Sequence, residues 1–348
     1  MNFEISICIF TRNRERYLKV ALDSIICQIT DDIRDKVEIC ISDNASNQDI
    51  KGLADKYRQK HPHITYFRFD KDMGVDINHL NAVAISRSPY CWTFCDDDIM
   101  LDGALKYILQ EIKENPDIDI FIGETIIYTK SLDEPAKSKF RLAKPSRDFI
   151  FEQGNTKGIL LLGFGTETIV RKEKWQLYSN DNKFLDTLFV QLYVMFSMIK
   201  NGSKLKSLIK PICGLRGFNG DDTFNVDGML RRFQYDIIAL KAIPEDVFGK
   251  KSKEAKMMAN QIMFNILAAV RALKMNAFKE KASLQLYFQL FDLLHQYYRN
   301  NILLYILVLP SLLLPSFIYK IMIYMYRKTL KKRRTIKDTG KIKELFYD

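Results

Sequence analysis

The chain has 348 residues, of which 47% are hydrophobic and 27% are charged, and its net charge is +11. This composition excludes a disordered chain, and this length allows a large buried core. The positive charge favours anionic partners such as nucleotide phosphates, acidic lipid headgroups or nucleic acid.

Strand-like and helix-like patterns alternate along the first third of the chain. Apolar runs predict strands at residues 5–10, 37–41, 64–69 and 90–94. Apolar residues spaced by three and four predict helices at 18–29, 53–57 and 75–85. A further helix is expected from about Asp102, which would suit its N-cap. This alternation predicts an α/β fold with a doubly wound, mainly parallel sheet.

Polar residues directly follow three of these strands. Thr11, Asp43 and Asp96 each come just past a strand end. In open α/β sheets, ligands bind beyond the carboxyl ends of the strands. We therefore expect these three distant segments to meet around one ligand.

Three consecutive carboxylates, Asp96, Asp97 and Asp98, follow the fourth strand. Adjacent carboxylates repel each other, and a divalent cation such as Mn²⁺ or Mg²⁺ removes that repulsion. Asp96 and Asp98 would lie on the same side of an extended segment, so both could reach one ion. The alternative is a solvated acidic loop or a helix N-cap.

The six cysteines form no CxxC pair, and Cys8, Cys40 and Cys91 fall in or beside apparent strands. Free cysteine behaves there as a small hydrophobic residue. We expect reduced thiols and a reducing compartment, in preference to disulfides or a zinc site. The strand-like start of the chain also argues against a secretory signal.

Four segments resemble the motifs of glycosyltransferase family 2, which has the GT-A fold. In order they are residues 5–14, 41–46, 73–78 and 90–98, and weaker similarity continues through 169–175, 210–211 and 216–222. Within the family, the segments are most similar to bacterial abequosyltransferase-like enzymes of O-antigen synthesis. The resemblance implies a metal-dependent, inverting glycosyltransferase.

The resemblance also implies roles for individual residues. Thr11 and its neighbours would line the base and ribose pocket, Asp43 would accept a hydrogen bond from the base, and Asp98 would bind the metal, with Asp96 facing the ribose or the metal. The expected nucleotide-sugar-binding residues are Thr11, Arg12, Asn13, Asp43, Asn44, Asp76, Asn78, Asp96, Asp97 and Arg216.

The chain departs from the family pattern at three positions. Phe10 and Arg12 replace a usual proline and tyrosine, and Ile77 replaces a common arginine. The identity of the nucleotide base is therefore open. No QxxRW-type segment is present, which favours transfer of a single sugar over processive polymerisation.

The catalytic base is expected in the second half of the chain, because an inverting enzyme deprotonates the acceptor hydroxyl with a carboxylate. Asp186 is the first candidate, with a helix N-cap as its alternative role. Glu167 is the second, with a surface carboxylate as its alternative. Asp221 and Asp222 could assist Arg216 at a pyrophosphate or metal, or could simply form a turn.

The C-terminal part is expected to be helical and to dock on a membrane. An apolar stretch at 302–319 contains Pro310 and Pro315, and basic residues follow it from Arg327 to Lys337. Such a pattern suits an anionic membrane surface better than a spanning helix, and a buried helix with a solvated tail is the alternative. We expect three parts: 1–125 binding the nucleotide sugar, 126–226 on the acceptor side, and 227–348 as the membrane-associating extension.

These features lead to one principal hypothesis. It is a cytoplasmic enzyme, peripheral on the inner face of a bacterial membrane, that moves one sugar to a lipid-linked or oligosaccharide acceptor. The alternatives are a non-catalytic module that binds nucleotide sugars or lipid, and a basic adaptor for membranes or nucleic acid. Nucleic acid is the weaker partner, because the basic residues are not interleaved with aromatic ones.

Overall fold

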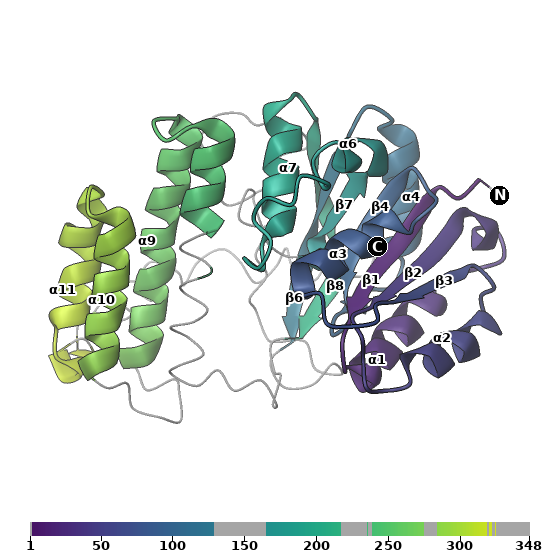
Figure 1. The fold of residues 1–348 in the computed structure, drawn as a ribbon, viewed down its shortest axis with the longest axis horizontal. Coiled ribbons are helices and arrows are strands. Elements are labelled where there is room, and N and C mark those ends of the chain that lie inside the picture. Colours follow the sequence, from purple (N-terminus) through teal and green to yellow (C-terminus); the bar gives the residue numbers. More distant parts are fainter. Residues whose placement is uncertain are drawn as a thin grey trace, which may run out of the picture. The chain divides into compact units, whose positions relative to one another are not determined.

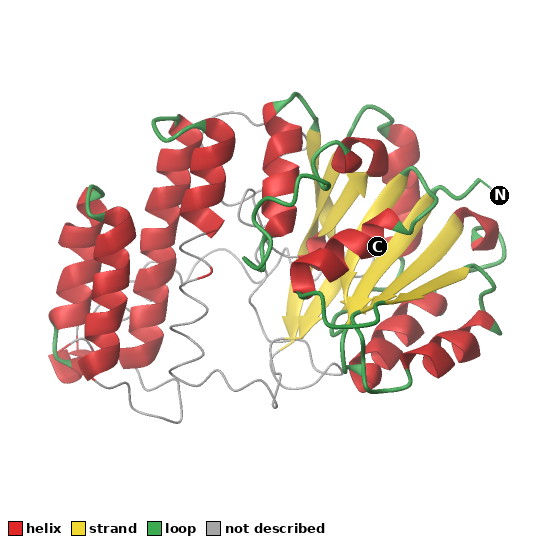
Figure 2. Cartoon of the chain, viewed as in Figure 1, coloured by secondary structure: helices red, strands yellow, loops and turns green. Residues whose placement is uncertain are grey.

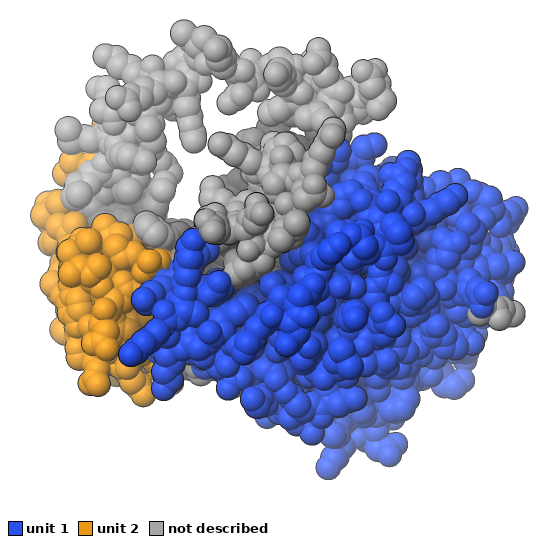
Figure 3. All heavy atoms as spheres, turned by 90° about the horizontal axis from the view of Figure 1, so that it is seen from above, with its two compact units in different colours: residues 1–223, 238–258 blue, residues 224–237, 259–348 orange. Residues whose placement is uncertain are grey.

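The computed structural model describes residues 2–128, 165–216, 239–274 and 284–318, together with positions 235, 320, 321 and 324. Contacts within the chain define two compact units (Figure 3). Unit 1 consists of residues 1–223 and 238–258, and unit 2 consists of residues 224–237 and 259–348.

Unit 1 is built on one sheet, whose eight described strands have the order β3-β2-β1-β4-β7-β6-β8-β5 (Figure 1). Strands β1 to β4 pair in parallel, β7 runs antiparallel to β4 and β6, and β8 is parallel to β6 but antiparallel to β5. The bounds are β1 Ile5–Thr11, β2 Val37–Asp43, β3 Ile64–Arg68, β4 Tyr90–Cys95, β5 Ile99–Met100, β6 Ile120–Tyr128, β7 Thr168–Arg171 and β8 Leu205–Arg216.

Helices cover both faces of this sheet (Figure 2). The α-helices of unit 1 are α1 Glu15–Ile26, α2 Ile50–Arg58, α3 Val75–Ala84, α4 Ala104–Glu114, α6 Lys172–Gln176 and α7 Val190–Lys200, and residues 239–248 are also helical. Alternate residues of β1 point to opposite faces. Ile5, Ile7 and Ile9 join the core formed with α1, α2 and α4. On the other face, Phe10 stacks on His79 of α3 at 4.4 Å between ring centroids.

The parallel register aligns the carboxyl ends of β1, β2 and β4. Thr11 pairs with Asp43, and Phe10 pairs with Cys95, the residue before the acidic triplet. Polar residues that follow these strands are therefore delivered to one edge of the sheet. The α/β fold class with a mainly parallel sheet is confirmed, as are the four strands predicted in the first third.

Four elements differ from the sequence-based expectation. Helix α4 begins at Ala104, and its N-cap is Gly103 with φ +74°, so Asp102 is not the cap. The left-handed conformation at that position is one that glycine adopts without strain. The short strand β5 precedes the helix, and the long strands β6 and β8 occupy regions where no strand was predicted.

Unit 2 is helical where it is described. Its elements are α10 Leu284–Tyr298, the π-helical turn η3 Leu304–Val308 and α11 Leu309–Leu313, and α9 Lys253–Lys274 runs into it from unit 1. Among the described residues, no helix combines the length and the apolar character that crossing a membrane requires. The basic residues from Arg327 to Lys337 lie outside the described part of the chain.

Candidate active site

Asp96 lies at the end of β4 and is 4% exposed. Its carboxylate accepts a hydrogen bond from the Thr11 hydroxyl at 2.6 Å. The Arg14 guanidinium lies 3.3 Å from Asp96 Oδ1 and 3.2 Å from Asp97 Oδ2. Burial raises the pKa of Asp96 to about 6, although Arg14 opposes the rise. The end of β1 and the loop after it thus hold the first acid of the triplet.

Asp98 is held by a different part of the chain. Its carboxylate accepts a hydrogen bond from the Thr166 hydroxyl at 2.5 Å and another from the backbone N–H of Arg216 at 3.2 Å. Burial, followed by the neighbouring charge of Asp97, raises the pKa of Asp98 to about 7. The raised pKa means that the charged form of this carboxylate is disfavoured, and a nearby cation would stabilise it.

The triplet forms a turn instead of the expected extended segment. The Asp98 N–H donates to the carbonyl of Cys95 at 3.3 Å. Because of this turn, Asp96 faces Thr11 while Asp98 faces Thr166, so the two do not share one side. The carboxylate that lies beside Asp98 is that of Asp97.

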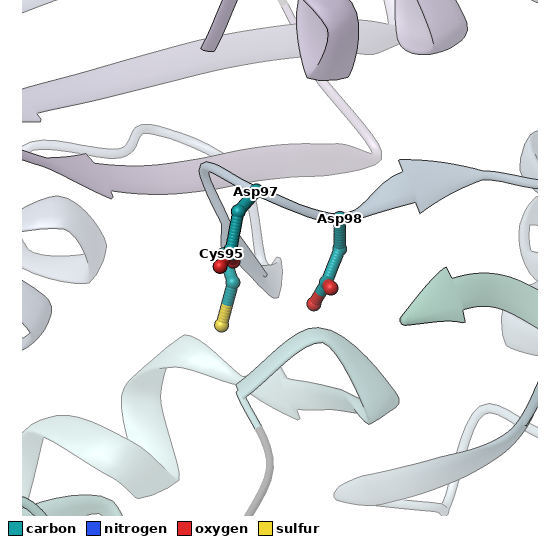
Figure 4. Close-up of side chains that lie close together, drawn as sticks. All are labelled: Cys95, Asp97 and Asp98. Carbon is teal, nitrogen blue, oxygen red and sulfur yellow. The ribbon is translucent and has the colours of Figure 1, made fainter. Parts of the chain in front are cut away.

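The group that fits one divalent ion, among the described residues, is Cys95, Asp97 and Asp98 (Figure 4). Their ligand atoms all lie within 4.8 Å of one another. Burial and then the charges of Asp98 and Asp97 raise the pKa of the Cys95 thiol well above its usual value. Of the three groups, the carboxylates offer the oxygen ligands that Mg²⁺ and Mn²⁺ prefer over sulfur.

Asp43 ends β2 and is 1% exposed. Its Oδ1 accepts the backbone N–H of Ser46 at 3.0 Å, and its Oδ2 accepts the Tyr66 hydroxyl at 2.8 Å. Arg68 lies 3.6 Å from the same Oδ2. Burial and the contact with Asp43 raise the pKa of Tyr66, which keeps the phenol protonated as a donor. The carboxylate is thus fixed in one orientation.

The loops beside Asp43 are held by side-chain hydrogen bonds. Asn44 donates to Asp72 at 2.6 Å and accepts the backbone N–H of Met73 at 2.8 Å. Arg12 forms an ion pair with the same Asp72 at 2.8 Å. Asn13, with φ +54°, accepts the backbone N–H of Asn47 at 2.7 Å. The predicted residues Arg12, Asn13 and Asn44 therefore order the loops around the strand ends.

Asp76 and Asn78 have partners inside the protein. Asp76 accepts backbone N–H groups from the segment before α7. Asn78 accepts the Ser42 hydroxyl at 2.7 Å and donates to the carbonyl of Thr11 at 3.1 Å. Asn78 thus ties the ends of β1 and β2 to helix α3. Direct contact of either residue with a nucleotide sugar stays a prediction.

The two candidate bases have opposite environments. Asp186 is exposed, and its φ is +62°. It is not the N-cap of α7, which is Phe189. Glu167 is fully buried, and its Oε1 accepts the Thr125 hydroxyl at 3.0 Å, so it is not a surface carboxylate. Of the two, Asp186 is the one that solvent can reach. Asp221 and Asp222 lie outside the described residues.

Several residues that hold the site were not singled out from the sequence. Arg14, Tyr66 and Thr166 contact the predicted carboxylates from 23 to 83 positions away. Arg216 also donates from Nε to the carbonyl of Asp97 at 3.1 Å, and its guanidinium lies over the ring of Tyr17. Only Arg14 carried a signal, because it lies within the first motif.

Comparisons with known proteins identify relatives of this chain. The chain matches the family model described as Glycosyl transferase family 2 over residues 6–176. It is 29% identical to abequosyltransferase RfbV of Salmonella typhimurium over 271 residues, which are 74% of this chain and 80% of that protein. It is also 29% identical to the uncharacterized glycosyltransferase MJ1057 of Methanocaldococcus jannaschii, over 40% of this chain and 49% of that protein.

Two solved structures share the fold. One is S. aureus TarS, residues 1–349, in complex with UDP-GlcNAc, with a TM-score of 0.56 and 14% identity. The other is the mannosyltransferase PcManGT from Pyrobaculum calidifontis in complex with GDP-Man and Mn²⁺, with a TM-score of 0.51 and 11% identity. Each alignment covers 86% of this chain and 82% of the solved chain.

Proposed function

Because this chain is a glycosyltransferase of family 2 with the GT-A fold, we propose that it transfers one sugar from a nucleotide-sugar donor. The acceptor would be a lipid-linked glycan in the synthesis of bacterial surface polysaccharide such as O-antigen. The observation that carries the proposal is the meeting of Thr11, Asp43 and Asp96 at the carboxyl edge of the parallel strands. The likeness to an abequosyltransferase supports a deoxyhexose or hexose as the transferred sugar.

The donor would lie along this edge. Asp43 accepts a hydrogen bond from the base, and Thr11, Arg12 and Asn13 lie beside the base and ribose. Solved relatives of the fold in complex with UDP and UDP-GlcNAc support a donor of this class. Arg14 and Arg216 bring positive charge to the acidic triplet, where they balance the diphosphate.

Asp98 and Asp97 would hold a divalent cation, Mn²⁺ or Mg²⁺, with Asp96 beside them. When bound, the cation neutralises the charge that develops on the departing nucleoside diphosphate. The Mn²⁺ in the mannosyltransferase complex supports this choice. Thr166 and the backbone of Arg216 orient Asp98 toward this role.

Asp186 would act as the base of an inverting transfer. Its exposure allows an acceptor hydroxyl to approach and pass its proton to the carboxylate, while the hydroxyl oxygen attacks the sugar carbon. Glu167 is less suited, because it is fully buried and bonded to Thr125.

Unit 2 would dock the enzyme on the anionic inner face of the plasma membrane, where a lipid-linked acceptor lies. Ile302, Ile306, Leu313 and Phe317 are each more than half exposed. Arginines and lysines follow them in the sequence from residue 327. Apolar side chains that a basic cluster follows in the sequence match an anionic lipid surface.

Flotation with vesicles that contain anionic lipid tests the membrane proposal. The variants Leu313→Glu and Phe317→Glu should reduce binding, because each places a charge on the apolar surface. The control Gln289→Glu adds the same charge at an exposed polar position. Equal binding by all three variants would exclude docking through this surface.

The activity is tested by a panel of nucleotide sugars with Mn²⁺, scored for donor binding and for sugar transfer or hydrolysis. Asp98→Ala should lose metal-dependent turnover, and the exposed neighbour variant Asp102→Ala should keep it. Donor binding without turnover under every condition would favour the non-catalytic module. Full turnover by Asp98→Ala would refute the proposed metal role.

A further inference from the structure

The segment before α7 has an unusual backbone. Asn182, Phe184, Asp186 and Leu188 have φ values of +55°, +59°, +62° and +65°. For residues other than glycine, the left-handed conformation costs about 1–2 kcal/mol each. Four such residues at alternate positions require contacts from the rest of the protein to hold them.

Asp76 supplies such contacts from helix α3. Its Oδ2 accepts the backbone N–H groups of Thr187 at 2.9 Å and Leu188 at 3.0 Å, and its Oδ1 accepts that of Val190 at 3.4 Å. Left-handed residues within a turn let successive N–H groups converge on an anion. Asp76 is 3% exposed, so an internal carboxylate fills this anion-binding concavity.

Gly74, two residues before Asp76 in the sequence, also lies close to the segment that carries Asp186. It has φ +83°, and a Cβ built on it would lie 3.3 Å from Asp186 Oδ1. The backbone at residue 74 therefore passes directly beside the Asp186 carboxylate. Helices α3 and α7 are also in contact and lie side by side (Figure 1).

We infer that Asp76 is a positioning residue that holds the Asp186 carboxylate at the donor edge. The connection is continuous: Asn78 ties α3 to the ends of β1 and β2, and Asp76 ties the same helix to the segment carrying Asp186. The acceptor-side base is thereby set relative to the strand ends that bind the donor. This inference rests on the proposed role of Asp186.

A double-mutant cycle of Asp76→Asn and Asp186→Asn tests the inference. The amide at position 76 keeps one acceptor oxygen but loses the other. Misplacing a catalytic group by about 1 Å reduces turnover by roughly 100-fold, so a kcat loss of this order is expected for Asp76→Asn. Its donor KM should stay within about twofold if Asp76 acts through the base, whereas a larger rise in donor KM without loss of kcat would overturn the inference in favour of direct contact with the nucleotide sugar.

In the Asp186→Asn background, Asp76→Asn should have no further effect on kcat, since it acts through that carboxylate. Asp246→Asn is the matched control. It removes a surface carboxylate that pairs with Lys183 of the same segment at 3.3 Å, and should leave kcat unchanged. Amide hydrogen exchange at residues 187 and 188 should accelerate in Asp76→Asn but not in Asp246→Asn.

Asp76→Glu keeps the charge but displaces the carboxylate by one methylene, and should also lower kcat with little change in donor KM. This second variant is used if Asp76→Asn does not fold. The inference is overturned if both position-76 variants turn over like wild type while Asp186→Asn is inactive. Multiplicative losses in the double variant also overturn it. Wild-type turnover by Asp186→Asn refutes the base itself, which is a separate result.

Discussion

Thr166→Val removes the hydroxyl that holds Asp98 while keeping the shape of the side chain. The hydroxyl donates to Asp98 Oδ2 at 2.5 Å and accepts the backbone N–H of Cys95 at 2.9 Å. Thr166 is fully buried, so water does not replace the lost partner. Both Asp98 and the Cys95 N–H therefore lose a hydrogen bond in the protein interior.

The expected magnitude follows from these two bonds. A hydrogen bond to a charged group contributes about 1.5–3 kcal/mol, and a buried N–H left without its partner costs about 1–3 kcal/mol. Metal-free Thr166→Val should thus be less stable by roughly 3 kcal/mol or more in urea unfolding. Loss of a residue that orients a metal ligand weakens metal binding about 10- to 100-fold. Calorimetric titration with Mn²⁺ at pH 8, above the pKa of Asp98 near 7, measures this change.

Thr166→Ser is the matched control, because it keeps the hydroxyl and loses only a methyl group. It should cost about 1 kcal/mol of stability and leave the affinity for Mn²⁺ within about twofold. If Thr166→Val binds Mn²⁺ as tightly as wild type, Asp98 is not held for a cation. If both variants lose affinity equally, packing matters and the hydroxyl does not.

Three further predictions concern pH, the base contact and the backbone. The pKa values of Asp98, about 7, and Asp96, about 6, lie above the ordinary 3.8, so the native metal-free protein holds protons that the unfolded chain releases. Its stability should fall as pH rises from about 4 to about 7. Urea unfolding of Asp98→Asn should show a weaker fall over the same range. Identical pH profiles for the wild type and Asp98→Asn would contradict this. Tyr66→Phe leaves Asp43 Oδ2 with Arg68 as its remaining partner and should raise the Kd of the donor about tenfold with kcat nearly unchanged, as calorimetry and kinetics would show. Ala45→Gly relieves a φ of +55° and should stabilise the protein by about 0.5–1 kcal/mol in urea unfolding, whereas a loss would show that Ala45 is unstrained.

The sequence predicts the first third of the fold because its elements follow one another with regular patterns. Strands β1 to β4 are apolar runs, and their order alone places Thr11 and Asp43 at one edge. β8 escapes prediction because Pro211 and exposed Ile209 interrupt its alternation. β5 has two residues, too few for a periodic signal.

The site is predictable only in part, because its supporting contacts are distant in the sequence. The rule that alternate residues share one side placed Asp96 with Asp98, but a turn brings Asp97 beside Asp98. Thr166 gives no pattern that links it to an acid 68 positions earlier. The resemblance implies a donor contact for Asp76, whereas its contacts with residues 187–190 appear only when the chain is folded.

The partners of Asp98 also determine how much of the chain must be synthesised before this part of the site can fold. The carboxylate depends on Thr166 and on Arg216, which is 118 positions later, and β5 is paired only when Cys213 and Gly214 of β8 arrive. Contacts this distant form slowly, after the loops between them have closed. A nascent chain that has emerged only to residue 128 already contains all four N-terminal motifs. Such a chain already provides Thr11 and Arg14 for Asp96 and Asp97, but Asp98 gains its partners only after residues 166 and 216 have been made.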